Sequence, residues 1–265
     1  MTMDMDKGII YVVLGDRYDK LAAHTLCYSR KFTQLPFCVV TNIKATARDP
    51  KWSEVSDVGF IEVDLPQNKN RFVKTCLPEF TPFDKTLYLD CDAVIQKQGI
   101  EQVFDMLDDC DMVLSYYLDW KPGDKIVKIA RDVMRLAGVK LPLRVYCGAF
   151  ICWDNANKKV TESVFPEWYT LWALSGRGRD MFQFCCSIKK NEARICEVDT
   201  EIRNGSVRTI FEPNTPNLKA IVQHNYNTTK SGQDFHDNFG LPRIQEYKPF
   251  DSDSSDWNWV EEDSE

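Results

Sequence analysis

The stretch Lys85-Thr-Leu-Tyr-Leu-Asp-Cys-Asp-Ala-Val-Ile95 is an apolar run interrupted by two carboxylates, Asp90 and Asp92. Such a run of strand-forming residues has no polar face to turn toward water, so it is typical of a strand buried on both faces of a sheet. The two carboxylates mark the place where this strand ends. Ligands of open α/β sheets bind at the C-terminal ends of strands, so this strand end is the first candidate for a functional site.

Apolar segments with strand character alternate along the chain with segments of helical periodicity. Besides the carboxylate strand, the predicted strands cover 8–14, 36–42, 58–63, 112–117, 145–152 and 195–198. The predicted helices cover 18–32, 71–77 (ended by Pro78), 100–107, 124–136 (capped by Asp124 and closed by Gly138), 160–174 and 181–189. This alternation predicts an α/β fold with a largely parallel sheet. We expect a single domain over 1–250 and an acidic, disordered tail over 251–265.

The composition argues against several classes of function. The 265 residues carry a formal net charge of -7, whereas a generic nucleic-acid binder needs a basic surface. No apolar stretch approaches the roughly 20 residues of a transmembrane helix, and the acidic N-terminus does not resemble a signal peptide. None of the 10 cysteines forms a C-x-x-C pair, so no zinc cluster is indicated. We therefore expect free thiols in a reducing compartment, which predicts an intracellular, cytoplasmic protein.

Three interpretations of the Asp90–Asp92 pair follow from its chemistry. A D-x-D pair at a strand end can hold Mg²⁺ or Mn²⁺, which prefer oxygen ligands and share them with substrate phosphates. A haloacid-dehalogenase-like phosphatase also ends an apolar strand in D-x-D, and there the first Asp is a nucleophile. The third interpretation is a pair of surface carboxylates that cap a turn. The phosphatase strand normally opens its domain, whereas three strands precede this one, so the order of elements favours metal binding.

Three motifs add a resemblance to a known family. The first strand ends in the turn Leu14-Gly-Asp-Arg-Tyr18. The second motif begins at Lys74 in a predicted short helix, continues through Leu77-Pro78 and a strand, and ends at the D-x-D pair. The third motif is His224-Asn-Tyr-Asn-Thr-Thr-Lys230, late in the chain. With these motifs, residues 8–232 resemble the GT-A glycosyltransferases, in particular the retaining glycogenin-like and galactinol-synthase-like family (family 8).

This resemblance implies a fold, a reaction and a set of site residues. The fold would be a single Rossmann-like GT-A domain with a mixed, mostly parallel sheet, and the reaction would be hexosyl transfer from a UDP-sugar with retention. The acceptor stays open between protein, glycan, lipid and polyol. The implied ligands of Mn²⁺ or Mg²⁺ are Asp90, Asp92 and His224. The implied donor-binding residues are Leu14, Gly15, Asp16, Tyr18, Lys74, Cys91, Asn227 and Lys230, and Asp180 would lie near the donor sugar.

The sequence departs from the family pattern at four places. Gly15 stands for an Asn of the first turn, and Asn227 stands for a Gly, which is a mild change because Asn tolerates positive φ. Tyr146-Cys-Gly148 stands where the family has Asn-Ser-Gly, and Met181 replaces a Gln. Two alternatives therefore remain beside the transferase: the phosphatase and a non-catalytic module that binds nucleotide sugars.

Overall fold

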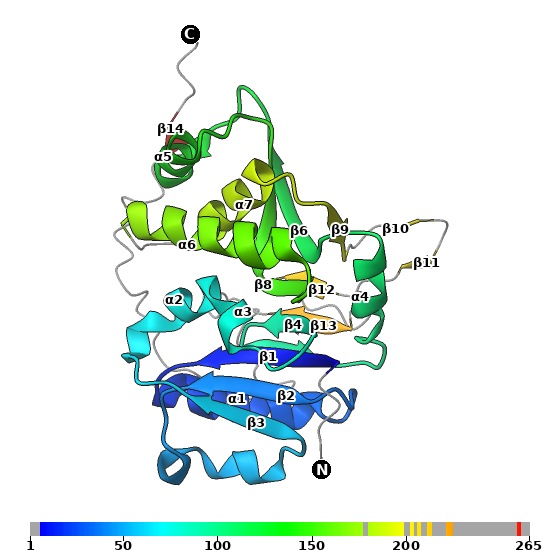
Figure 1. The fold of residues 1–265 in the computed structure, drawn as a ribbon. Helices are drawn as coiled ribbons and strands as arrows, with labels where there is room; N and C mark the ends of the chain where they lie inside the picture. The colour runs from blue at the N-terminus through cyan, green and yellow to red at the C-terminus, as the bar shows by residue number, and fades with distance from the viewer. Residues whose placement is uncertain are drawn as a thin grey trace.

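A seven-stranded sheet with the order β3-β2-β1-β4-β8-β6-β9 forms the centre of the molecule (Figure 1). The computed structural model describes residues 6–176 and 180–198 and the short segments 202–203, 206–207, 211–213, 221–224 and 259–260. The strands of the central sheet are β1 (Lys7–Val13), β2 (Phe37–Thr41), β3 (Val58–Glu62), β4 (Lys85–Leu89), β6 (Met112–Trp120), β8 (Leu143–Asp154) and β9 (Ile195–Glu197).

Strand direction divides this sheet into two parts. β1, β2, β3 and β4 run parallel to one another. β8 runs antiparallel to both β4 and β6, and β6 and β9 are again parallel. The sheet is therefore mixed and mostly parallel, which confirms the predicted α/β class.

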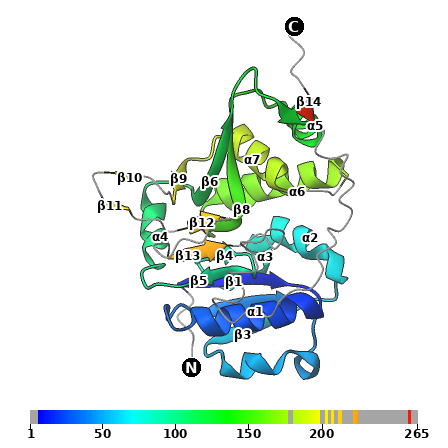
Figure 2. The same ribbon diagram turned by 180° about the vertical axis from the view of Figure 1, so that it is seen from behind.

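Helices cover both faces of the sheet (Figures 1 and 2). Along β1, Ile9 and Tyr11 belong to one hydrophobic core and Ile10 and Val12 to the other, as expected for a strand buried on both faces. The first core includes side chains of α1 (Asp16–Ser29) and α4 (Gln102–Asp105). The second includes side chains of α2 (Asn70–Thr75), α3 (Leu77–Phe80), α5 (Lys128–Ala137), α6 (Phe165–Leu174) and α7 (Met181–Lys190).

Short helices and strands complete the described chain. The 3₁₀ turns are Ala45–Ala47, Pro50–Glu54, Gln67–Lys69 and Met106–Asp108, and a π-helical turn over Val160–Val164 leads into α6. The two-residue strands β10 (Ile202–Arg203) and β11 (Ser206–Val207) pair antiparallel.

The carboxylate stretch joins two sheets. β4 ends at Leu89, directly before Asp90, as the pattern predicted. The following residues form β5 (Ala93–Ile95), which belongs to a second sheet with β13 (Val222–His224) and β12 (Phe211–Pro213). The Ala93 N–H donates to the Asp90 carbonyl at 2.9 Å, which closes the chain into a tight turn. The D-x-D residues therefore sit in a short connection that is fixed by a sheet on either side.

Two predicted helix ends are wrong. Pro78 does not end a helix but stands in the first turn of α3, where its missing N–H costs no hydrogen bond. α5 does not begin at Asp124, because β7 (Ile126–Val127) comes first and pairs antiparallel with β14 (Trp259–Val260). Gly138 does end α5, with a left-handed φ of 69°.

Several predictions on the C-terminal part lie outside the described residues. Asn227, Lys230 and all of 251–265 except Trp259 and Val260 belong to this group. Within the described part of the chain, no helix combines the length and the apolar character that crossing a membrane would need.

Candidate active site

Two asparagine side chains fix the backbone of the turn after β1. Asn42, which follows β2, accepts a hydrogen bond from the Gly15 N–H at 2.8 Å and donates one to the Leu65 carbonyl at 2.9 Å. Asn70, at the start of α2, accepts from the Leu14 N–H at 3.1 Å. Both amides are satisfied by neighbouring elements, so the turn is formed before any ligand arrives.

Gly15 is required at its position for two reasons. Its φ is +96°, in a region that L side chains rarely adopt. In addition, a Cβ here would lie 3.0 Å from both Cβ and Oε1 of Gln67. Gly15 therefore replaces the Asn of the family turn for a local reason. The positive φ disfavours any side chain here, and Gln67 leaves no space for one.

The other predicted donor-binding residues of this turn differ in accessibility. Leu14 is fully buried, so a ligand could reach it only through its backbone. Asp16 is exposed in the first turn of α1. Tyr18 is half-buried beside the core that α1 covers, with the guanidinium carbon of Arg17 5.9 Å from its ring centre. Because β1 and β4 are adjacent and parallel, these residues lie at the same sheet edge as the D-x-D turn.

Asp90 is held by two protein donors on one oxygen atom. The Tyr88 hydroxyl and the Lys74 ammonium both donate to Asp90 Oδ1, the ammonium at 3.2 Å. Tyr88 is two residues before Asp90, so the strand directs both side chains to the same face. The Lys74 Nζ comes from α2 and lies 4.9 Å from the centre of the Tyr88 ring. The orientation of the Asp90 carboxylate is therefore set by the protein.

Lys74 also joins Asp90 to Asp180. Its Nζ lies 3.9 Å from Oδ2 of Asp180, which directly precedes α7, and the Arg71 Nε lies 4.0 Å from Oδ1. Asp180 Oδ2 is buried, and the described residues offer it no hydrogen-bond donor. A buried carboxylate oxygen without a hydrogen bond is costly, and among the described residues this atom keeps its capacity to accept one.

Gly148 of β8 makes room for the head group of Lys74. A Cβ at Gly148 would lie 3.3 Å from Nζ and 3.7 Å from Cε of Lys74. A larger residue would push the ammonium away from the two carboxylates, so the small residue on β8 is part of the same arrangement.

Burial and charge set the protonation of the groups around Lys74. Burial opposes the ammonium charge, but Asp90 and Asp180 outweigh it and raise the pKa of Lys74. Burial and then Asp90 raise the pKa of the Tyr88 hydroxyl, which therefore remains a neutral donor. Burial also raises the pKa of the Cys91 thiol, so Cys91 offers no thiolate to a metal. The site therefore contains a buried cation between two carboxylates, and the Cys91 thiol adds no further negative charge.

The backbone of His224 lies beside the D-x-D turn. β13 pairs antiparallel with β5, and in this register His224 stands opposite Ala93, the residue after Asp92. Asp92 itself is half-buried. Among the described side chains, no group of three His, Cys, Asp or Glu could hold a metal ion. The role of His224 as a metal ligand therefore stays a prediction. Its backbone lies beside the turn that carries Asp90 and Asp92.

Four residues that hold the site were not predicted: Tyr88, Asn42, Asn70 and Arg71. Tyr88 carries a readable signal, because a polar aromatic residue two positions before Asp90 on a strand faces the same side. Asn42 and Asn70 carry a weaker one, since each is an amide at the edge of an apolar strand or a helix. Arg71 looks like any exposed basic residue on a short helix, and no sequence signal distinguishes it.

The comparison with known proteins decides the fold. No protein-family model matches the sequence, and no curated protein matches it. The apo structure of the bifunctional glycosyltransferase WbbM superimposes with a TM-score of 0.62 at 12% identity, over 91% of this chain and 51% of that one. The galactosyltransferase LgtC, in complex with donor and acceptor sugar analogues, gives 0.58 at 13% identity over 90% and 98%. The chain has the GT-A glycosyltransferase fold.

A third structure with this GT-A fold differs further in sequence. Mouse xyloside xylosyltransferase 1, in its apo form, gives a TM-score of 0.58 at 10% identity, over 84% of this chain and 99% of that one. This chain thus spans about half the length of WbbM and nearly all of the other two. At such identities the likeness concerns the GT-A fold, and the identity of donor and acceptor must be argued from the site.

Proposed function

We propose that this chain is a metal-dependent glycosyltransferase that transfers a hexose from a UDP-sugar to an acceptor hydroxyl, with retention of configuration. The observation that carries the proposal is the buried ammonium of Lys74 between the carboxylates of Asp90 and Asp180, at the C-terminal end of β4 in a GT-A fold. The likeness to LgtC, a galactosyltransferase solved with sugar analogues of donor and acceptor, supports a sugar donor.

The donor atoms of the site fit a divalent metal such as Mn²⁺ or Mg²⁺. Asp90 and Asp92 provide the carboxylate oxygens that these cations prefer. The pairing of β13 with β5 brings His224 to the same turn. We expect these three residues to hold the metal. When bound, the metal supplies positive charge that stabilises the departing diphosphate.

The remaining residues would bind and orient the two substrates. The turn at Asp16 and Tyr18 would receive the nucleoside, while Lys230 would contact the diphosphate. Asp180 Oδ2 would accept a hydrogen bond from a hydroxyl of the donor sugar, because that oxygen is buried and lacks a donor among the described residues. Lys74 would hold this carboxylate in place while balancing its charge.

The transfer itself exchanges one bond at the anomeric carbon for another. The bond from this carbon to the diphosphate oxygen breaks, and its electron pair leaves with UDP. The acceptor oxygen forms the new bond to the same carbon, and its proton passes to the departing phosphate oxygen. Attack on the face that the diphosphate leaves gives the retained configuration.

A phosphatase with Asp90 as nucleophile is the second candidate. In this chain Tyr88 and Lys74 both donate to Asp90 Oδ1, which lowers the nucleophilicity of that oxygen. The GT-A fold also argues against the phosphatase. A non-catalytic module would bind the same donor at the same residues and would differ only in lacking turnover.

Thermal unfolding with UDP, with and without Mn²⁺, tests the proposal. UDP at about 100 times its Kd adds about 2.7 kcal/mol, which raises the Tm by about 5 °C or more for a chain of this size. We expect this shift only when Mn²⁺ is present, and we expect Asp92→Asn to abolish it. Asp132→Asn, an exposed carboxylate on α5, is the matched control and should keep the shift.

Turnover assays separate the three candidates. A transferase hydrolyses UDP-glucose, UDP-galactose or UDP-N-acetylglucosamine slowly in Mn²⁺ and stops in EDTA, while showing no activity on phosphomonoesters. Phosphomonoester hydrolysis that is lost in Asp90→Asn would establish the phosphatase instead. A Tm shift without any donor turnover would leave only the binding module.

The compartment is a separate proposal. All 10 cysteines are free thiols, and most of them are buried in the two cores. Free buried thiols are typical of proteins in a reducing environment, which supports a cytoplasmic location.

A further inference from the structure

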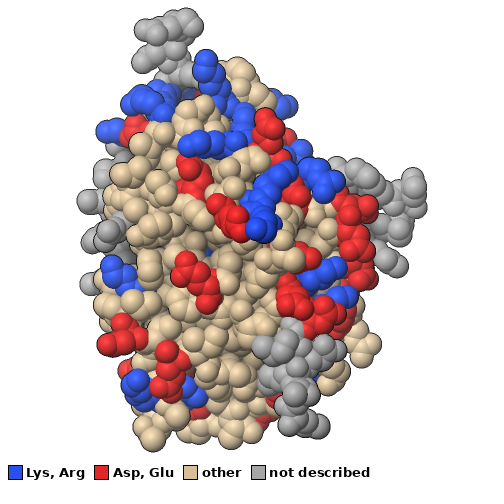
Figure 3. All heavy atoms as spheres, in the orientation of Figure 1, with Lys and Arg blue, Asp and Glu red and all other residues tan. Residues whose placement is uncertain are grey.

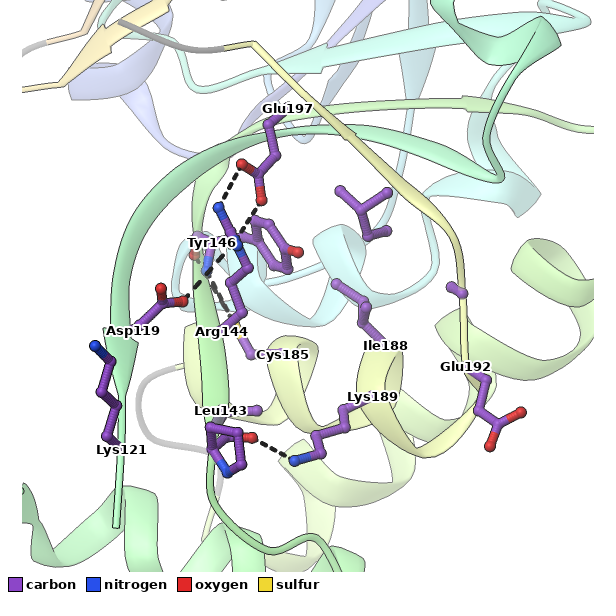
Figure 4. Close-up of a pocket in the computed structure, with 13 residues that line it drawn as sticks. Asp119, Lys121, Leu143, Arg144, Tyr146, Cys185, Ile188, Lys189, Glu192 and Glu197 are labelled. Carbon is purple, nitrogen blue, oxygen red and sulfur yellow. Dashed lines mark hydrogen bonds and ion pairs between the residues drawn. The ribbon is translucent and has the colours of Figure 1, made fainter. Parts of the chain in front are cut away.

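A hollow of about 650 Å³ lies beside the candidate active site and opens to solvent (Figure 4). The end of β6, the start of β8, α7 and the segment 192–197 surround it. Leu143, Ile188, Ala193 and Ile195 give it an apolar lining. Sites for small molecules measure about 300–1,000 Å³ and combine such a lining with a few polar groups.

Strand β8 connects this hollow to the buried ammonium. Tyr146 lines the hollow and precedes Gly148 by two residues, so both point to the same face of β8. The two positions are roughly 7 Å apart along a strand. The Tyr146 N–H also donates to Sγ of Cys185 at 3.2 Å, on the helix that follows Asp180. The hollow therefore begins about one side-chain length from the place where Lys74 and Asp180 meet.

The polar wall of the hollow is a fixed ion pair. The Arg144 Nη2 donates to Oε2 of Glu197 at 2.7 Å, and the Arg144 Nε lies 2.5 Å from Oε1. Asp119 lies 3.9 Å from the same Nε, and the guanidinium is 4.7 Å from the centre of the Tyr116 ring. A carboxylate in such a pair still has lone pairs for further hydrogen bonds, so Glu197 and Asp119 can accept from hydroxyl groups.

The charges around the hollow cancel. Three acidic residues, Asp119, Glu192 and Glu197, line it together with three basic ones, Lys121, Arg144 and Lys189. Two of the cations are engaged by the protein: Arg144 by carboxylates, and Lys189 by the carbonyls of Lys140 and Pro142. A phosphate or carboxylate ligand would therefore gain little here, whereas a neutral molecule with hydroxyl groups and an apolar face matches the lining.

We propose that this hollow is the acceptor subsite and that it takes a neutral sugar residue, the end of a glycan or a simple glycoside. Carboxylates of Glu197 and Asp119 accept hydrogen bonds from its hydroxyl groups, and the apolar lining contacts a ring face. This assignment rests on the proposed function, since only a transferase needs an acceptor subsite beside its donor site.

Saturation-transfer NMR on the full chain with UDP and Mn²⁺ tests the assignment. The probes are the methyl glycosides of glucose, galactose and N-acetylglucosamine, with glucose 6-phosphate as the anionic comparison. We expect signals from the ring protons of at least one neutral glycoside and a weaker signal from the phosphate. Ala193→Phe fills the hollow and should reduce the glycoside signal about tenfold, because the lining no longer admits a ring.

Two further variants make the result decisive. Ala156→Phe introduces the same side chain at an exposed turn after β8 and should leave the signal unchanged. Glu197→Gln keeps the side-chain volume and replaces the carboxylate by a neutral amide, so it should raise the glycoside Kd about tenfold. This variant tests the subsite even if Ala193→Phe fails to fold.

The outcomes separate this inference from the proposed function. Unchanged glycoside signals in Ala193→Phe and Glu197→Gln overturn the subsite, as does stronger binding of glucose 6-phosphate or no glycoside signal from the parent chain. If UDP with Mn²⁺ gives no thermal shift while both variants still weaken glycoside binding, the donor proposal fails and the hollow stands as a sugar site.

Discussion

At the scale of single residues, the orientation of the Asp90 carboxylate is set by the protein. Tyr88 and Lys74 both donate to its Oδ1. A carboxylate with one oxygen fixed in this way has little rotational freedom left to lose when a cation binds to it. Pre-organisation of this kind improves metal affinity because ligand groups no longer need to be ordered on binding.

Tyr88→Phe should therefore weaken the metal site without unfolding the chain. The ring stays buried, but the hydrogen bond to Asp90 is lost. Loss of a group that holds a metal-binding carboxylate in place typically costs 10–100-fold in metal affinity, so we expect a loss of about tenfold. Titration of free Mn²⁺ by electron paramagnetic resonance in the presence of UDP measures the change. It reports metal affinity independently of turnover.

Tyr11→Phe is the matched control for this substitution. Tyr11 is also fully buried on a strand, and its hydroxyl has no hydrogen-bond partner among the described residues. Its variant should bind Mn²⁺ like the parent chain. Equal Mn²⁺ affinity in both variants would mean that Tyr88 contributes packing only.

The sequence identified site residues that interrupt an apolar strand pattern, but it did not identify site residues that fit such a pattern. Asp90 and Asp92 interrupt an apolar run, so their position was predicted. Tyr88 suits a buried strand on its own account. Its spacing of two residues from Asp90 indicates a shared face, but the sequence does not show that its hydroxyl donates to Asp90. Gly15 looked like a loss relative to the family turn, because φ and the proximity of Gln67 exist only in three dimensions.

At the scale of elements, Asp111 holds the segment 192–197, which forms one side of the hollow described above. It directly precedes β6 and is 6% exposed. Its Oδ2 accepts from the Arg194 N–H at 2.8 Å and from the Lys159 Nζ at 3.1 Å, and its Oδ1 accepts from the Asn157 Nδ2 at 3.2 Å. Burial raises the pKa of this carboxyl, but these donors outweigh burial and lower it.

Asp111→Asn should lower the free energy of unfolding by about 2 kcal/mol at pH 7, since it removes the charged acceptor that these three donors share. A depressed pKa adds stability above the unfolded value of about 3.9, and this contribution is lost as the pH falls through the folded pKa. The difference between the variant and the parent should therefore be constant from about pH 7 to pH 5 and shrink below about pH 4.

Urea unfolding at several pH values measures this difference. Asp109→Asn, an exposed carboxylate two residues earlier, is the control and should change stability little at any of these pH values. A pH-independent loss in Asp111→Asn would show that packing of the segment 192–197, and not the carboxylate charge, is what the substitution removes.

The sequence predicted which long helices and strands exist, but it did not predict which strands pair with one another. The apolar periodicity located β1, β2, β3 and α1 to within a few residues. It could not show that the chain leaves the main sheet after Asp92, because β5 pairs with β13, a segment far away in the sequence. It also placed the start of α5 too early, since β7 depends on pairing with β14.

At the scale of the whole molecule, charge is unevenly distributed. Lys and Arg side chains gather at the end of the molecule that carries α5, at the top of Figure 3. Exposed basic residues of this region are Lys121, Lys125, Lys128, Arg135 and Lys140. The segment 251–265 has seven acidic residues and no basic one, and its β14 pairs with β7 next to α5. We expect attraction between this acidic segment and the basic region to stabilise the pairing of β14 with β7.

Replacing the seven carboxylates of 251–265 by their amides should therefore loosen this pairing. We expect the backbone amides of Ile126 and Val127 to exchange several-fold faster with deuterium, and salt to produce the same effect in the parent chain. A chain with the same tail residues in shuffled order is the control, because it keeps the charge and loses the strand sequence. Exchange that is unaltered by charge removal would exclude an electrostatic contribution.

The direction of β8 was beyond a single sequence for a physical reason. Parallel and antiparallel strands that are buried on both faces have the same apolar pattern, so β-α-β alternation predicted a largely parallel sheet without identifying β8 as the strand that runs the other way. In the molecule β8 reverses that direction and pairs with β4 on one side and β6 on the other.

This central place of β8 has a consequence for how the protein is made. β1 to β4 leave the ribosome well before β8. During synthesis the edge of β4 that pairs with β8 therefore stays unpaired while about 50 further residues are added. An unpaired edge of this kind is a template for wrong strand partners. The part of the chain before β8 is therefore no independent folding unit. If the chain were cut before β8, the edge of β4 would stay unpaired, and a chimera that used this part would need another strand in the place of β8.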